Sequence, residues 1–127
     1  MKNIKFLDNP QDYNPSNAFV VHVNSKDEIL KQLNEKLLFP DYFGFNWNAL
    51  WDMLCDFSWI EQQKVVLIHD ELPNLDEREL KIYLKILFDA TKAWKKEDEH
   101  TLEVVFPESS EKQIKLVYKA VANKLLK

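Results

Sequence analysis

Three runs of β-forming residues mark the strands that the chain is expected to form. Residues 18–23, 64–70 and 101–106 are almost continuously apolar, without the alternation of a strand that has one face in water. Such runs are typical of strands covered on both faces, as in parallel sheets. Residues 4–7 could form a further short strand.

Apolar residues between these runs recur at the three- and four-residue spacing of amphipathic helices. Ser25 and Glu28 form a capping box for a first helix, which should end before Pro40. Asn46 is a suitable N-cap for a second helix that reaches Phe57.

The second half of the chain repeats this alternation of helix and strand. Asp76 and Glu79 form another capping pair, which opens a long helix with an apolar stripe. A capping pattern at Ser110 opens a last helix. Its apolar face consists of Ile114, Val117, Tyr118, Val121 and Leu125.

Strands separated by helices of this length require crossover connections, which join parallel strands. The pattern therefore predicts an α/β fold, a small three-stranded parallel sheet packed with helices, plus an extra C-terminal helix. The 127 residues suit one domain. Its core is expected over about residues 18–106, with an N-terminal extension over 1–17 and the C-terminal helix over 108–127.

The stretch over residues 40–57 combines features that are unusual in this chain. It contains Gly44, the only glycine, and residues 37–63 include no Lys or Arg. A single glycine is expected where the backbone takes a positive φ or closely approaches another group, although an ordinary turn would also accommodate it. Tyr42 and Phe43 should be exposed or half exposed at the bend of this loop.

The helix expected after Asn46 has two distinct faces at 100° per residue. Its apolar face suits a protein core and consists of Trp47, Leu50, Met53, Leu54 and Phe57. Its opposite face carries Asn48, Asp52, Cys55 and Asp56, with Trp51 at the border. Carboxylates beside an exposed indole are typical of protein interfaces, and an acidic face attracts a basic partner. A solvated acidic helix face is the simpler alternative.

Charge and cysteine content narrow the class of protein further. A net charge of −4, with lysines scattered among glutamates, argues against direct binding to nucleic acid. The single cysteine, Cys55, suits a reducing compartment. The first residues lack the apolar run of a signal peptide, and no segment is apolar enough to cross a membrane. We therefore expect a cytoplasmic protein.

The sequence offers little catalytic chemistry. It has no glycine-rich phosphate loop and no His or Cys cluster with zinc spacing. His69, Asp70 and Glu71 are adjacent on a strand, so their side chains should point to alternate faces rather than converge. Cys55 lies within a helix beside acidic residues, which should raise the pKa of its thiol. We therefore expect no catalytic residue, metal or cofactor, and no enzyme.

The loop and the helix after it closely resemble the signature of the barstar family, the intracellular inhibitors of secreted bacterial ribonucleases. The matching residues, 40–54, read PDYFGFNWNALWDML. The family pattern is a proline, an aromatic pair, a glycine, any residue, an asparagine, and then a helix containing Ala-Leu-Trp-Asp. The family's order of strands and helices also agrees with the order predicted here, from about Ala18 to Phe106.

This resemblance implies that the loop and the second helix plug the active site of a ribonuclease. Acidic side chains would replace the substrate phosphates, with Asp52 as the main mimic. Tyr42 and Gly44 would form the rim contact, and Asn46 would support the loop. The surrounding surface would be filled by Trp51, Cys55 and Phe57, and Asp56 lies on the same outer face.

Some positions depart from the family pattern. Asn48 stands where the well-known inhibitor has a second acid, and Phe57 stands where it has a tryptophan. Asp89 is a candidate for the family's further acid on the long helix. The expected partner is a basic protein, a bacterial ribonuclease or nuclease toxin, bound one to one by a chain that is otherwise monomeric. The alternative is a non-catalytic adaptor that binds a basic protein other than a nuclease.

Overall fold

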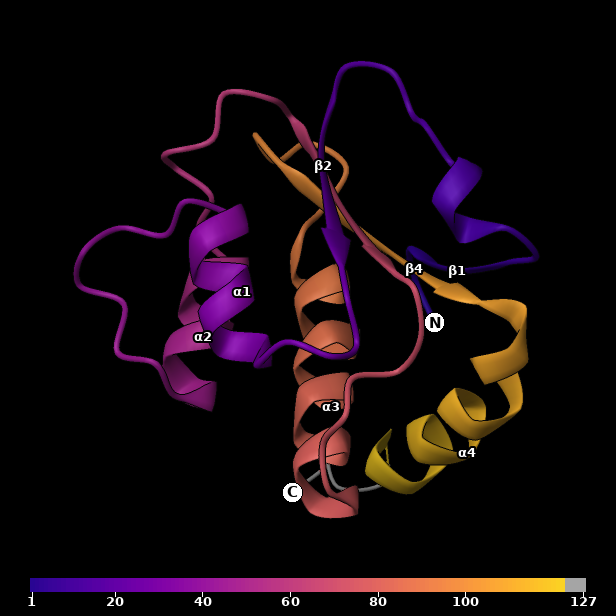
Figure 1. Ribbon diagram of the computed structural model, residues 1–127. Coiled ribbons are helices and arrows are strands. Elements are labelled where there is room, and N and C mark those ends of the chain that lie inside the picture. Colours follow the sequence, from indigo (N-terminus) through magenta and orange to yellow (C-terminus); the bar gives the residue numbers. More distant parts are fainter. Residues whose placement is uncertain (123–127) are drawn as a thin grey trace.

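A computed structural model describes residues 1–122, which form a parallel four-stranded sheet with helices packed against it (Figure 1). The strands follow the order β1-β4-β3-β2. They are β1 (Ile4–Leu7), β2 (Ala18–Val23), β3 (Lys64–His69) and β4 (Thr101–Pro107). The predicted α/β class is confirmed, but the sheet has four strands rather than three.

The strand in addition to the three predicted is β1, the short run over residues 4–7. It pairs with the outer edge of β4, so that Ile4 lies beside Val104. A run of four residues carries little periodic signal, and only the open edge of β4 fixes its place in the sheet. At the other edge, β2 is partly exposed over residues 18–20, so the expectation that both of its faces are covered is wrong there.

The helices pack their apolar sides against one face of the sheet. They are α1 (Ile29–Lys36), α2 (Trp47–Leu54), α3 (Glu77–Ala93) and α4 (Glu111–Ala122), with 3-10 turns η1 (Pro10–Asp12) and η2 (Glu108–Ser110). Asp76 caps α3 as predicted, because its carboxylate accepts a hydrogen bond from the Glu79 amide at 2.8 Å. Leu125, predicted on the last helix, lies outside the described residues. None of the helices over residues 1–122 is long and apolar enough to cross a membrane.

The first helix starts later than its capping box suggests. The Asn24 side chain accepts hydrogen bonds from the amides of Lys26 and Asp27, which holds this segment in a turn rather than a helix. Glu28 then acts as the N-cap of α1 by accepting from the Lys31 amide at 2.6 Å. The prediction of Ser25 as the N-cap is therefore wrong.

The opposite face of the sheet is covered by the N-terminal segment. Val66, Ile68 and Val105 are fully buried on this face, and Tyr13 packs against them. In Figure 1, η1 lies on the side of β1 and β4 away from α3 and α4. Residues 1–17 thus supply both an edge strand and a cover for the sheet.

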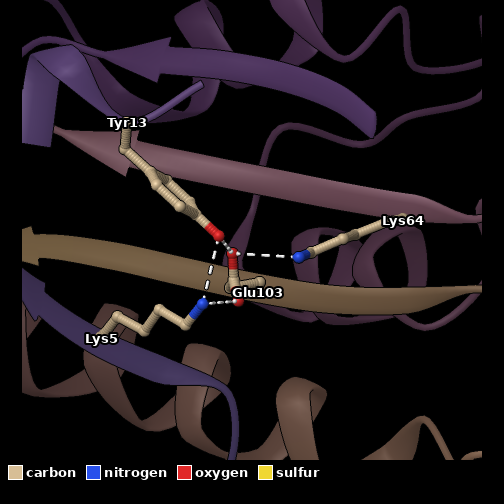
Figure 2. A network of polar contacts seen from close by, with 4 residues as sticks. All are labelled: Lys5, Tyr13, Lys64 and Glu103. Carbon is tan, nitrogen blue, oxygen red and sulfur yellow. Dashed lines mark hydrogen bonds and ion pairs between the residues drawn. The ribbon is translucent and has the colours of Figure 1, made fainter. Parts of the chain in front are cut away.

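A buried glutamate on β4 ties this cover to the sheet (Figure 2). Glu103 accepts a hydrogen bond from the Tyr13 hydroxyl at 2.6 Å, and its carboxylate oxygens lie 2.9 and 3.5 Å from the ammonium groups of Lys5 and Lys64. Burial alone raises the pKa of Glu103, but these hydrogen bonds and positive charges outweigh it and hold the pKa below its ordinary value. The carboxylate is therefore charged at neutral pH.

Candidate functional site

The loop that joins α1 to α2 projects from the body of the molecule, at the left of Figure 1. Tyr42 is its most exposed aromatic residue, with 70% of its surface accessible. Phe43 is buried and packs its ring against Phe39, with 4.7 Å between the ring centroids. The expected exposure is thus confirmed for Tyr42 and wrong for Phe43, because the loop folds back on its own aromatic side chains.

Gly44 does not adopt the conformation that its rarity suggests. Its φ is not positive, whereas the next residue, Phe45, has a φ of 52°. A Cβ atom at position 44 would lie 3.4 Å from the side-chain nitrogen Nδ2 of Asn46 and 3.7 Å from the Ala49 Cβ, so a small side chain would fit. The prediction of a positive φ at Gly44 is therefore wrong, and Phe45 is the residue in the left-handed region.

Asn46 fixes the start of α2, as predicted. Its side-chain oxygen accepts a hydrogen bond from the Ala49 amide at 2.7 Å, and its carbonyl accepts one from the Leu50 amide at 3.0 Å. Its side-chain nitrogen donates to the Gly44 carbonyl at 3.5 Å. One side chain therefore orients both the helix and the loop before it.

The two faces of α2 are arranged as the sequence predicts. Leu50, Met53 and Leu54 are buried on the inner face. The outer side chains are Asn48, Trp51 and Asp52, which are exposed, and Cys55 and Asp56, which are half-buried.

Phe57 does not reach the outer surface. The prediction that α2 reaches Phe57 is wrong, because the helix ends at Leu54. Phe57 follows in a turn, with a φ of 54° and a fully buried ring. The ring lies almost parallel to that of Trp94, with 5.7 Å between centroids. The predicted contact role of Phe57 is therefore corrected, because its side chain belongs to the core.

Cys55 lies within the influence of two acids. Burial is the largest cause that raises the pKa of its thiol to about 11, and the charges of Asp52 and Asp89 raise it further. The raised pKa was predicted from the acidic neighbours. A thiol that stays protonated at neutral pH is a weak nucleophile.

The charge of Asp89, on α3, thus acts on Cys55, at the outer face of α2. Lys85 pairs with Asp89 at 2.9 Å on the same helix. A hollow of about 360 Å³ adjoins this region, and its lining includes Cys55 and the acids Asp56, Asp98 and Glu99. The acidic character of α2 thus continues onto neighbouring segments.

The residues at the end of β3 do not form a second site. His69 is fully buried and bonded to Tyr83, whereas the Asp70 carboxylate accepts hydrogen bonds from the amides of Ser25 and Glu71. Their side chains diverge, as predicted. Among residues 1–122, no three His, Cys, Asp or Glu side chains form a group that could hold a metal ion.

Comparison with known proteins gives a single result. The family model described as Barstar (barnase inhibitor) matches residues 18–107, which include the loop, α2 and three strands of the sheet. No curated protein and no solved structure matches the chain.

Proposed function

The chain belongs to the barstar family, and from this membership we propose that it is an intracellular inhibitor of a ribonuclease. It binds the enzyme one to one through the loop before α2 and the outer face of that helix. It blocks access of RNA to the active site and carries out no chemistry of its own.

The observation that carries this proposal is the position of Asp52. Its carboxylate is exposed on the outer face of α2, beside the exposed indole of Trp51. Residues 37–63 contain no Lys or Arg that could neutralise it. An exposed carboxylate in such a setting can replace a substrate phosphate against the Arg, Lys and His side chains of a ribonuclease.

We call the proposed contact region the inhibitory surface. It consists of Tyr42, Gly44, Asn46, Asn48, Trp51, Asp52, Cys55 and Asp56. Asn48 is neutral, so Asp52 is the single carboxylate that α2 presents on this surface. Asp89 is the candidate for an additional acid from α3, because its charge reaches Cys55.

The surface acts in two ways. The acids and the net charge of −4 attract a basic enzyme over a distance and speed its association. Once the complex has formed, the basic groups of the active site are shielded from water and depend on Asp52 for neutralisation. Removal of this one charge would leave several cations buried together.

Titration calorimetry against a panel of small secreted ribonucleases, with RNA cleavage followed in parallel, tests the proposal. We expect tight one-to-one binding that abolishes cleavage. Asp52→Asn should weaken binding by about 3 to 5 kcal/mol, the usual cost of an unpaired buried charge. Asp12→Asn is the matched control, because Asp12 is exposed on η1, on the other side of the molecule. Unchanged affinity of Asp52→Asn would contradict phosphate mimicry, and no binding across the panel would contradict inhibition of a ribonuclease.

A further inference from the structure

We propose that Phe45 is an apolar anchor of the inhibitory surface, which enters an apolar recess beside the cationic site of the ribonuclease. This inference rests on the proposed function and adds the chemistry of the partner to it. The argument depends on the backbone conformation, exposure and support of this one side chain.

Phe45 is held in an unfavourable backbone conformation that burial of its side chain does not offset. Within residues 1–122, five residues other than glycine have a positive φ: Asn3, Asn17, Leu38, Phe45 and Phe57. Asparagine tolerates this region, and bulky residues rarely adopt it. Leu38 lies in the hydrogen-bonded turn that ends α1, and Phe57 gains full burial. Phe45 is spanned only by the long bond of 3.5 Å from the Asn46 side chain to the Gly44 carbonyl, and 54% of its surface is exposed.

The only glycine of the chain lies one position earlier, where a positive φ is not needed. The opposite arrangement, with glycine at position 45, would remove the backbone strain and an exposed apolar ring together. Strain that is retained at an exposed residue is a reason to infer a function for its side chain.

Packing at the start of α2 accounts for only part of the apolar surface of the Phe45 ring. Phe45 precedes the N-cap Asn46, where an apolar side chain often packs on the fourth residue of the helix, here Leu50. A ring that is more than half exposed leaves most of its apolar surface available for another contact.

A continuous series of aromatic rings supports Phe45 from the core. The centroid distances from one ring to the next are 4.9 Å for Phe45–Phe43, 4.7 Å for Phe43–Phe39, 5.9 Å for Phe39–Trp59, 6.1 Å for Trp59–Phe57 and 5.7 Å for Phe57–Trp94. The Trp59 indole also donates to the Leu37 carbonyl at 2.9 Å, which holds the start of the loop. An exposed ring that is already positioned loses little freedom on binding.

The position of Phe45 identifies the kind of surface that it fits. It lies in the sequence between Gly44 and Asn46, two members of the inhibitory surface, whose own exposed aromatic residues are Tyr42 and Trp51. The partner must therefore present cationic groups for Asp52 and an apolar recess next to them. A uniformly polar basic site would leave the ring of Phe45 against charged groups.

The test compares Phe45→Asn with the unchanged chain against each ribonuclease of the panel that the chain binds. Asparagine tolerates the left-handed region, so the fold and thermal unfolding should be preserved. We expect dissociation to become roughly ten- to a hundredfold faster, as for the loss of one buried aromatic side chain. Phe45→Gly, which also suits this backbone, should show the same loss.

Leu116→Gln is the matched control, because Leu116 is also an exposed apolar residue, with 61% accessible, but lies on α4 at the other side of the molecule. It should leave binding unchanged. The Phe45→Asn effect should be independent of salt, whereas that of Asp52→Asn should shrink as salt rises.

The possible outcomes separate the two proposals. Unchanged binding by folded Phe45→Asn and Phe45→Gly, together with weakened binding by Asp52→Asn, would overturn the apolar anchor alone. Weakened binding by all three variants, with the expected difference in salt dependence, would support both proposals. A failure to bind any ribonuclease would overturn the proposed function and the anchor that rests on it.

Discussion

His69, at the end of β3, is a fully buried histidine with both ring nitrogens hydrogen-bonded. Nδ1 lies 3.2 Å from the Val105 carbonyl, which can only accept, so Nδ1 carries the proton. Nε2 therefore accepts from the Tyr83 hydroxyl at 2.7 Å. Burial lowers the pKa of His69 to about 4, although the bond to Val105 opposes this shift. The ring is thus neutral throughout the physiological range.

This neutral histidine predicts a loss of stability in mild acid. Between pH 7 and 5 the unfolded chain takes up a proton on His69 and the folded chain does not, so the free energy of unfolding should fall by about 2 kcal/mol. Urea unfolding at a series of pH values measures this loss. His69→Gln should remove most of it, whereas His22→Gln, at an exposed histidine, should retain it. An equal dependence on pH in His69→Gln would contradict the assignment.

At the scale of the element, α2 depends on its first cap. Asn46→Ala should lower the free energy of unfolding by about 1 kcal/mol, because the Ala49 amide loses its partner. Asn46→Ser, which can also cap, should recover most of that loss. Urea unfolding of both variants measures the difference, and equal stability of the Ala and Ser variants would contradict the capping role.

Helical periodicity predicted burial along α2 more accurately than it predicted backbone conformation. Phe57 continues the apolar stripe and is fully buried as expected, yet it lies beyond the helix with a positive φ. The pattern reports which side chains reach the core, and a turn can bring a side chain there as well as a helix can. For the same reason the outer face of α2 could be predicted, but the left-handed Phe45 could not.

At the scale of the whole molecule, the sheet depends on residues outside the region that the family model matches. That match begins at residue 18, whereas β1 and Tyr13 come before it. The sequence showed a possible strand at residues 4–7, but no local pattern indicates that this strand joins β4 or that Tyr13 covers Val66. Such contacts between distant residues depend on how the whole sheet assembles.

Deletion of residues 1–17 should therefore destabilise the molecule by several kcal/mol. It would expose the buried face around Val66, Ile68 and Val105 and remove two partners of the Glu103 carboxylate. Tyr13→Phe, which removes one hydrogen bond to a charged group, should cost roughly 1.5 to 3 kcal/mol. Urea unfolding of both variants makes the comparison, and a shortened chain as stable as the whole would contradict a structural role for this segment.

The strand order also determines when this chain can finish folding as it leaves the ribosome. Ile4 is synthesised long before its neighbour Val104. Contacts between such distant residues form slowly, and until then an apolar first strand is open to mispairing. The rings that hold the loop include Trp94, which is synthesised well after the loop itself. A newly made molecule therefore acquires its rigid loop and its closed sheet only after both Trp94 and Val104 have been made.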